Sequence, residues 1–417
     1  MGRTSRAFAL AYVLAFCVSG LATQAQAGGF ALREQSSFYQ GTSFAGAAAG
    51  ATLSSMFWNP AALGTVGDGF TNEAVFSFVV PTSDVTVTNT VAPLAITPGL
   101  RGDIGLDAFI PGSYGAYRVN ERLALGFSAN GPFGLATKFP VNDPIRNVAG
   151  TSEVFSLNVA PTVAYEVADG FTVALGAQIQ YIDVRYTSNS FDLRGDDVGF
   201  GFTAGLLWRP LEGTSIGLGF RSSVSNTLEG SDTANNVPIR IDNFDTPEIV
   251  TFSVEQRVTE AFRVSGTVEW TNWSRAETFP VINTNTGAQH VVGVPISVAL
   301  EYDDSWYFAL GGEYDYSDDL TLRAGIGYEL SPVGDAVRSL RLPDDDRLWL
   351  SAGLSYTPRD HIRLDAGYSY IHVGETSIPS TFASNGGVSA TVDADVHIFT
   401  LGVNVALEDG LAGLFGH

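Results

Sequence analysis

A two-residue alternation of side-chain character begins near Phe70 and continues almost to the end of the chain. In residues 262–271, Phe, Val, Gly, Val and Trp alternate with Arg, Ser, Thr, Glu and Thr, and residues 320–329 repeat the pattern. This period gives a β-strand one oily face and one small or polar face. Beyond the N-terminus no run approaches the roughly 18 apolar residues that a membrane helix needs. Any contact with a membrane must therefore be made by strands.

The composition requires apolar surface that water does not reach. Charged residues make up 16% of the 417 residues, whereas soluble domains carry roughly 25%. The whole chain contains a single lysine, Lys138, although the polar face of a soluble sheet is normally richer in lysine. Tyrosines end the apolar faces, as at Tyr314, Tyr328 and Tyr356, which is typical of strands that meet a bilayer interface.

The alternating segments predict an all-β fold, a transmembrane antiparallel β-barrel. Short connections, such as 120–121 and 169–170, alternate with long ones, such as 82–104 and 230–245. This asymmetry is typical of bacterial outer-membrane barrels, which have even strand numbers. We expect about fourteen strands, near residues 70–81, 105–119, 122–138, 151–168, 170–187, 197–209, 214–229, 247–258, 261–279, 304–317, 319–331, 345–357, 360–374 and 389–407.

The chain divides into four parts. Residues 1–27 have the charged start, apolar stretch and Ala-Gln-Ala end of a secretory signal peptide. Residues 28–66 are rich in Ala, Gly and Ser, lack the alternation, and end in a turn at Asn59 and Pro60. Residues 67–407 carry the strands, and residues 408–417 form a C-terminal tail. We expect the strands to form a wall around residues 28–66.

The sequence gives no indication of catalysis, of a cofactor or of nucleic acid binding. The formal net charge is −22, which repels nucleic acid. No histidine pair has metal-site spacing, and no Gly-x-Ser-x-Gly motif is present. The three carboxylates of residues 344–346 lack the calcium-loop pattern, so we expect them to pair with nearby arginines. A barrel enzyme that modifies lipid and a general porin for polar solutes remain alternatives.

The third expected strand is interrupted. Proline cannot donate to a strand ladder, and the flanking glycines permit a bulge or kink. One interpretation is a gap in the barrel wall; the other is that the strand ends here in a loop. The interruption consists of Asn130, Gly131, Pro132, Phe133 and Gly134.

Several motifs, in the same order and over nearly the whole chain after residue 27, resemble the FadL-type outer-membrane transporters of long-chain fatty acids and other hydrophobic compounds. They are Asn-Pro-Ala at 59–61, Gly-Leu-Ala-Thr at 134–137, Trp-Thr-Asn-Trp-Ser at 270–274, and Ser331-Pro332 followed by Arg338 and by Pro-Asp-Asp-Asp-Arg-Leu-Trp-Leu-Ser-Ala-Gly at 343–353. The last run is highly specific, whereas Asn-Pro-Ala alone would be weak.

The resemblance implies a fourteen-stranded barrel in the bacterial outer membrane, plugged by an N-terminal hatch at residues 28–66. The segment with Phe30 and Leu32 would lie under an apolar lumenal pocket, and the kink at residues 130–134 would open sideways to the outer-membrane lipid. We expect a monomer without cofactor or enzymatic activity that takes up a fatty acid or a hydrocarbon. Arg33, Glu34 and Gln35 should face lumenal groups such as Arg263, Glu269 or Arg323.

One departure concerns the substrate. In the fatty-acid transporters a basic residue on the fifth strand helps to hold the carboxylate, and its expected position here is Asp183. Arg185 lies two residues further on and is a candidate lumenal contact for an anion. Unless Arg185 substitutes, the sequence favours neutral oily ligands.

Overall fold

The computed structural model describes residues 28–91 and 96–407. The expected signal peptide and C-terminal tail therefore lie outside the described residues. Among the described residues, no helix has the length and apolar character needed to cross a membrane.

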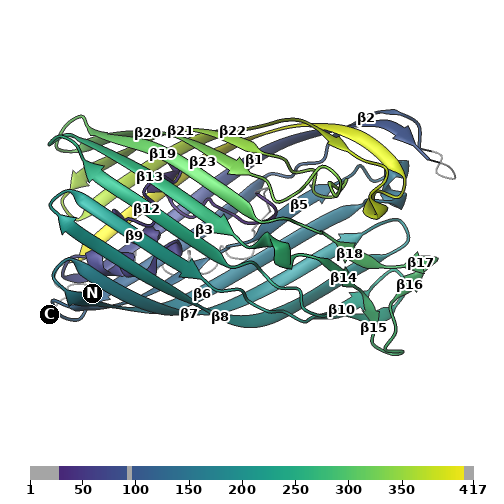
Figure 1. Cartoon of the computed structure of the whole chain (residues 1–417), viewed down its shortest axis with the longest axis horizontal. Coiled ribbons are helices and arrows are strands. Elements are labelled where there is room, and N and C mark those ends of the chain that lie inside the picture. Colours follow the sequence, from purple (N-terminus) through teal and green to yellow (C-terminus); the bar gives the residue numbers. More distant parts are fainter. Residues whose placement is uncertain (1–27, 92–95, 408–417) are drawn as a thin grey trace, which may run out of the picture.

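The strands form a closed antiparallel barrel, in which the last strand pairs with the first (Figure 1). The wall has fourteen strand positions, which we call staves, and β4 and β5 together make up one stave. The staves are β1 (Gly69–Thr90), β3 (Ala108–Arg118), β4 (Leu123–Asn130) continued by β5 (Gly134–Lys138), β6 (Thr151–Ala168), β7 (Phe171–Thr187), β8 (Asp192–Leu211), β9 (Thr214–Arg221), β12 (Ile249–Arg257), β13 (Phe262–Thr271), β19 (Ser305–Asp315), β20 (Leu320–Leu330), β21 (Arg347–Arg359), β22 (Ile362–Ile378) and β23 (Val388–Leu407).

The alternation sorts side chains as expected for a membrane barrel. Trp306, Leu310 and Tyr314 on β19 face outward with 41%, 64% and 50% of their surface exposed. Their neighbours Tyr307 and Glu313 face the lumen and are buried. The outer face of the wall therefore offers apolar surface to lipid, while the inner face lines the lumen.

The two ends of the barrel differ. Tight turns join the staves at one end, while the other end carries long loops with further short elements (Figure 1). These elements are β2 (Gly99–Asp103), η4 (Pro144–Asn147), β10 (Leu228–Asp232), β11 (Val237–Ile241), η5 (Trp273–Arg275), β14 (Thr278–Pro280), β15 (Ile282–Asn283), β16 (Val291–Val292), β17 (Val294–Pro295), β18 (Ser297–Ala299) and η6 (Ala383–Asn385).

Several expected strand boundaries were wrong at this long-loop end; the strand expected at 261–279, for example, ends at Thr271. The first strand continues to Thr90 because Val85 and Val87 keep the alternation, bury their side chains and pair with β23. The strand expected at 214–229 ends at Arg221. The chain returns at β10, which pairs with the outer part of β8 and with β11, so the connection expected at 230–245 contains part of a hairpin.

Candidate functional site

Residues 28–66, which we call the N-terminal segment, pack against the lumenal face of the wall. Within it, α2 (Ser37–Gln40) contacts β21, β22 and β23, and η3 (Pro60–Thr65) contacts β6, β7 and β8. A third turn, η2 (Leu53–Phe57), contacts β1 and β3. Close approach depends on glycines of the wall, since a Cβ at Gly217 would collide with the Ala48 carbonyl and one at Gly219 with the Trp58 carbonyl.

Asn59 and Pro60 begin η3 by ordinary capping. The Asn59 side-chain oxygen accepts a hydrogen bond from Ala61 N (3.0 Å), and Pro60 occupies the first helical position, where no amide hydrogen is needed. The Asn59 amide nitrogen also donates to the carbonyls of Ala48 and Leu206 at 2.8 and 2.9 Å. Asn59 therefore joins the segment to β8 as well as fixing its own turn.

Buried charges anchor the same segment to the wall. Arg33 pairs with Glu269 (2.6 Å) and Glu329 (3.1 Å), and its guanidinium lies 3.8 Å from the ring centre of Tyr307. The expected contact between Arg33 and Glu269 is confirmed. Arg323 instead stacks on Phe38 of the segment, and its carboxylate partners are on the wall.

The third stave is broken at the residues marked in the sequence. β4 pairs with β3 and β6 up to Asn130, whereas β5, from Gly134 onward, pairs with β6 alone among the described strands. Residues 108–112 of β3 pair with β1 but have no ladder partner on the side of the third stave within the described chain. Just before β3, the chain meets β5 again through a β-bridge between Gly105 and Thr137 and a hydrogen bond from Lys138 N to the Ile104 carbonyl at 3.0 Å.

The broken segment turns inward and bonds to the N-terminal segment. Leu32 N donates to the Pro132 carbonyl and Gly134 N donates to the Phe30 carbonyl, both at 2.8 Å. Ala31 and Phe133 form the β-bridge between them. The Gln35 side chain donates to the Gly131 carbonyl at 2.8 Å. The backbone hydrogen bonds that β3 does not supply are thus partly supplied from inside the lumen.

Phe30 lies at the centre of an aromatic cluster behind the break. Its ring centre is 4.5 Å from Trp273, 5.9 Å from Phe133 and 6.2 Å from Phe244. Beside it is an apolar cavity of about 50 Å³, which is much too small for a long acyl chain. A bound chain would have to displace these side chains. The larger uncharged lining residues of the cavity are Phe30, Leu135, Val154, Val184, Tyr186, Phe244, Val298, Leu300, Tyr302 and Leu342, and its charged lining residues are Glu153, Arg185 and Arg341.

Arg341 is the buried cation of this cavity, with only 5% of its surface exposed. Its guanidinium stacks on Tyr186 at 3.7 Å and donates to the carbonyls of Val148 and Thr187 at 2.7 and 2.8 Å. No carboxylate of the described residues forms an ion pair with it, and its Nε lacks a hydrogen-bond acceptor there. Burial lowers the pKa of Arg341, with Tyr186 opposing that shift.

Arg185, the expected lumenal anion contact, also lines this cavity, but carboxylates of the protein already engage its guanidinium. It lies on the face of β7 opposite to the buried Val184, and its side chain is 32% exposed. Both of its guanidinium edges are engaged, by Asp192 at 3.1 Å and by Glu153 at 3.9 Å. The parity of β7 already indicated this orientation, because Arg185 alternates in step with the lipid-facing Leu175 and Ile179.

Two of the three carboxylates of residues 344–346 pair with arginines, as expected, whereas Asp346 accepts hydrogen bonds from the Tyr328 hydroxyl and Ser331 N. Asp344 is bound by Arg347, and Asp345 pairs with Arg338 at 2.9 Å. Asp344 also accepts a hydrogen bond from Gly29 N at 3.1 Å, so this long loop contacts the start of the N-terminal segment. In the described part of the chain no group of three or more metal-ligating side chains occurs.

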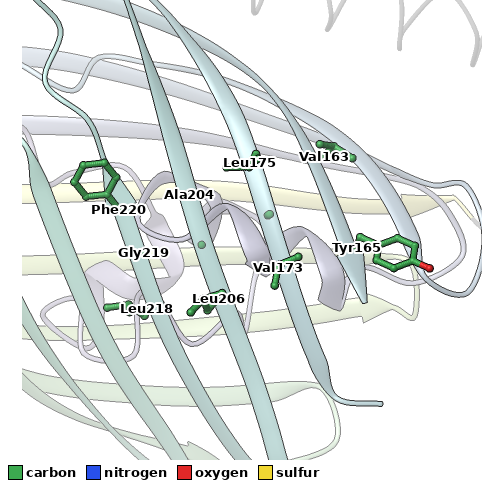
Figure 2. A pocket seen from close by; sticks show the side chains of 11 residues that line it. Val163, Tyr165, Val173, Leu175, Ala204, Leu206, Leu218, Gly219 and Phe220 are labelled. Atoms are coloured by element: carbon green, nitrogen blue, oxygen red, sulfur yellow. The ribbon is translucent and has the colours of Figure 1, made fainter. Parts of the chain in front are cut away.

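A second hollow lies on the outer face of the wall, over β6 to β9 (Figure 2). Ala204 and Gly219 leave it open, and η3 packs against the inner side of the same staves. Because this hollow faces lipid and has no charged lining residue, it differs from the cavity around Phe30. Its larger lining residues are Val163, Tyr165, Val173, Leu175, Leu206, Leu218 and Phe220.

Comparisons with known proteins agree with this architecture. The family model for the outer membrane protein transport protein (OMPP1/FadL/TodX) matches residues 18–407. The long-chain fatty acid transport protein of Escherichia coli K12 is 27% identical over 435 residues, which cover 89% of this chain and 95% of that protein. The corresponding protein of Salmonella typhi is 26% identical, with 89% and 94% covered.

Solved structures give the same fold. A FadL homologue from Pseudomonas aeruginosa superposes with a TM-score of 0.78 at 20% identity, covering 90% of this chain and 99% of that one. The Ralstonia pickettii toluene transporter TbuX gives 0.64 at 18% identity, covering 90% and 100%. The chain is an outer-membrane β-barrel and belongs to the OMPP1/FadL/TodX family of transport proteins, whose members carry fatty acids and other hydrophobic compounds.

Proposed function

We propose that this protein takes up long-chain fatty acids through the cavity around Phe30 and releases them sideways, through the broken third stave, into the outer membrane. The N-terminal segment would act as a hatch that closes the lumen along the barrel axis. The residues of the proposed path are Phe30, Leu32, Asn59 and Pro60 in the hatch and Asn130, Gly131, Pro132, Phe133 and Gly134 at the lateral opening.

One observation carries this proposal: Phe133 of the break packs directly against Phe30, which lines the cavity. Phe133 is the middle of the inward-turned segment and also packs against Phe30 and Trp273 beside the cavity. A ligand that displaced this cluster would disturb the contacts between Phe30, Leu32 and the break. Filling the cavity and opening the wall are therefore parts of one rearrangement.

The energetics need no external energy source. Each methylene gains about 0.8 kcal/mol on leaving water for an apolar environment, and both the cavity and the membrane interior are apolar. The barrier is the polar surface outside the membrane. A path from an apolar cavity to lipid through the wall runs downhill for a long acyl chain.

Arg341 favours a carboxylate over a neutral hydrocarbon. The named relatives include both long-chain fatty acid transport proteins and a toluene transporter, so the family alone does not decide. A buried guanidinium without a carboxylate partner is costly, and a ligand carboxylate would relieve that cost through charge-assisted hydrogen bonds. Arg341 would supply this contact in place of the Arg185 expected from the sequence.

The test is to close the break. In the double variant Gly131→Val/Pro132→Thr the third stave can continue as a regular strand, so uptake of radiolabelled oleate by cells lacking another uptake route should be lost. Heat-modifiable gel mobility would verify that the barrel is folded. Pro161→Thr, which replaces a lipid-facing proline in the unbroken β6, is the matched control and should transport normally. Normal uptake by the folded double variant would refute the proposal.

A further inference from the structure

Three side-chain amides form a row across the inner wall next to the break. Asn130 ends β4, Asn158 is its direct partner on β6, and Gln180 is the partner of Asn158 on β7. All three face the lumen, and each has at most 1% of its surface exposed. We call these three residues the amide row.

The amide row has hydrogen-bonding capacity that the described protein does not use. Neither the oxygen nor the nitrogen of any of the three amides makes a hydrogen bond of acceptable geometry, although the Tyr114 hydroxyl lies close to Asn130. Each amide can donate two hydrogen bonds and accept two. Buried polar groups are normally paired, so this row is suited to transient hydrogen bonds with a ligand that passes it.

Neighbouring polar groups are, by contrast, engaged. Gln178, two residues from Gln180 on the same face, is bound by Arg221 and donates to the Phe202 carbonyl at 3.0 Å. The Ser156 hydroxyl accepts from Phe133 N and donates to its carbonyl, which fixes the inward-turned segment. Other buried polar atoms of the described residues also lack partners, among them both Glu34 carboxylate oxygens and the Gln35 side-chain oxygen, but the row brings three wholly unpaired amides together on adjacent strands.

The row also lies where the surroundings change from apolar to polar. On β7, Ile182 and Val184 belong to the apolar cluster with Phe30 and Phe133, and Gln180 follows them toward the tight-turn end. On β6, Val154 belongs to that cluster and Asn158 lies four residues further along the strand. An acyl chain passing out between β3 and the broken stave would leave its polar end at this boundary.

We propose that the amide row is a head-group subsite, which hydrogen-bonds the carboxyl or hydroxyl end of an amphiphile while its tail enters the membrane through the break. This inference rests on the proposed lateral exit. It assigns to Asn158 and Gln180 a role distinct from that of Arg341. Arg341 would select a charged carboxylate in the cavity, whereas uncharged amides can pair with any head group that donates or accepts hydrogen bonds.

The experiment compares three substrates of equal chain length: oleic acid, oleyl alcohol and octadecene. In the full-length double variant Asn158→Leu/Gln180→Leu, uptake of the acid and the alcohol should fall about tenfold, as expected for the loss of one or two hydrogen bonds. Octadecene uptake should change less than about twofold, because it has no head group. Gln178→Leu, an amide with protein partners, is the control and should leave the ratio of acid to hydrocarbon uptake unchanged.

The outcomes separate the two proposals. Equal loss for all three substrates, or no loss for any, would overturn the subsite. If the double variant does not fold, the single variant Gln180→Met is compared with the three substrates in the same way, and the same outcomes support or overturn the subsite. Failure of the lateral exit would show itself differently, because closing the break would then leave uptake of all three substrates intact in a chain with wild-type amides.

Discussion

Replacing Arg341 by methionine should convert a carboxylate-selective cavity into one that does not distinguish charge. Methionine keeps much of the aliphatic volume but removes the guanidinium that stacks on Tyr186. A hydrogen bond to a charged group contributes about 1.5–3 kcal/mol, so oleate affinity should fall about 10- to 150-fold. Oleyl alcohol, which carries no charge, should lose less than about threefold.

The assay is calorimetric titration of purified protein in detergent with each ligand. Arg185→Met is the matched control, since Arg185 lies near the same cavity but is already paired with Asp192. That variant should bind oleate nearly as the wild type does. Equal losses of oleate and alcohol affinity in Arg341→Met would refute the reasoning, because the arginine would then be only structural. A larger effect of Arg185→Met would refute it as well.

Two further predictions concern the N-terminal segment. Burial raises the pKa of Glu34 from 4.5 to about 7, partly opposed by Arg33. Because the folded state binds this proton more tightly than the unfolded state, the contribution of Glu34 to stability should fall by about 3 kcal/mol as the pH rises from below 4.5 to above 7. Glu34→Gln should remove that fall in thermal denaturation scans, and an unchanged pH profile would contradict the assignment. Deleting residues 28–64 should produce steady large openings in planar bilayers, whereas a barrel still closed to small ions would show that the segment is not a hatch.

The strands of the barrel wall were largely predictable because the alternation that defines them lies in consecutive residues of the sequence. Alternation assigns each side chain to lipid or lumen from the sequence alone, as for Trp306 and Tyr307. The same rule sets Arg185 on the face of β7 opposite to Val184, but its carboxylate partners Asp192 and Glu153 could not be read from the alternation. The turn at Asn59 and Pro60 was equally local, since capping needs only neighbouring residues.

The long loops and the cavity were less predictable because their partners are distant in sequence. β10 is defined by pairing with β8 and β11, and nothing in residues 228–232 indicates which strand will be adjacent. Arg341 was visible as one of several arginines near three carboxylates. Only the folded loop shows that Arg338 pairs with Asp345 and Arg347 with Asp344. Arg341 instead stacks on Tyr186 beside the cavity.

The central claim is that substrate leaves through the wall, and photo-crosslinking tests it most directly. A fatty acid with a diazirine near its tail would be irradiated in outer membranes containing the protein, and adducts would be mapped by mass spectrometry. We predict adducts at Phe30 and Phe133 and on residues 108–112 of β3, which border the break. Adducts concentrated instead on Leu53–Phe57 and the tight-turn end of the lumen would show passage along the barrel axis and contradict the account.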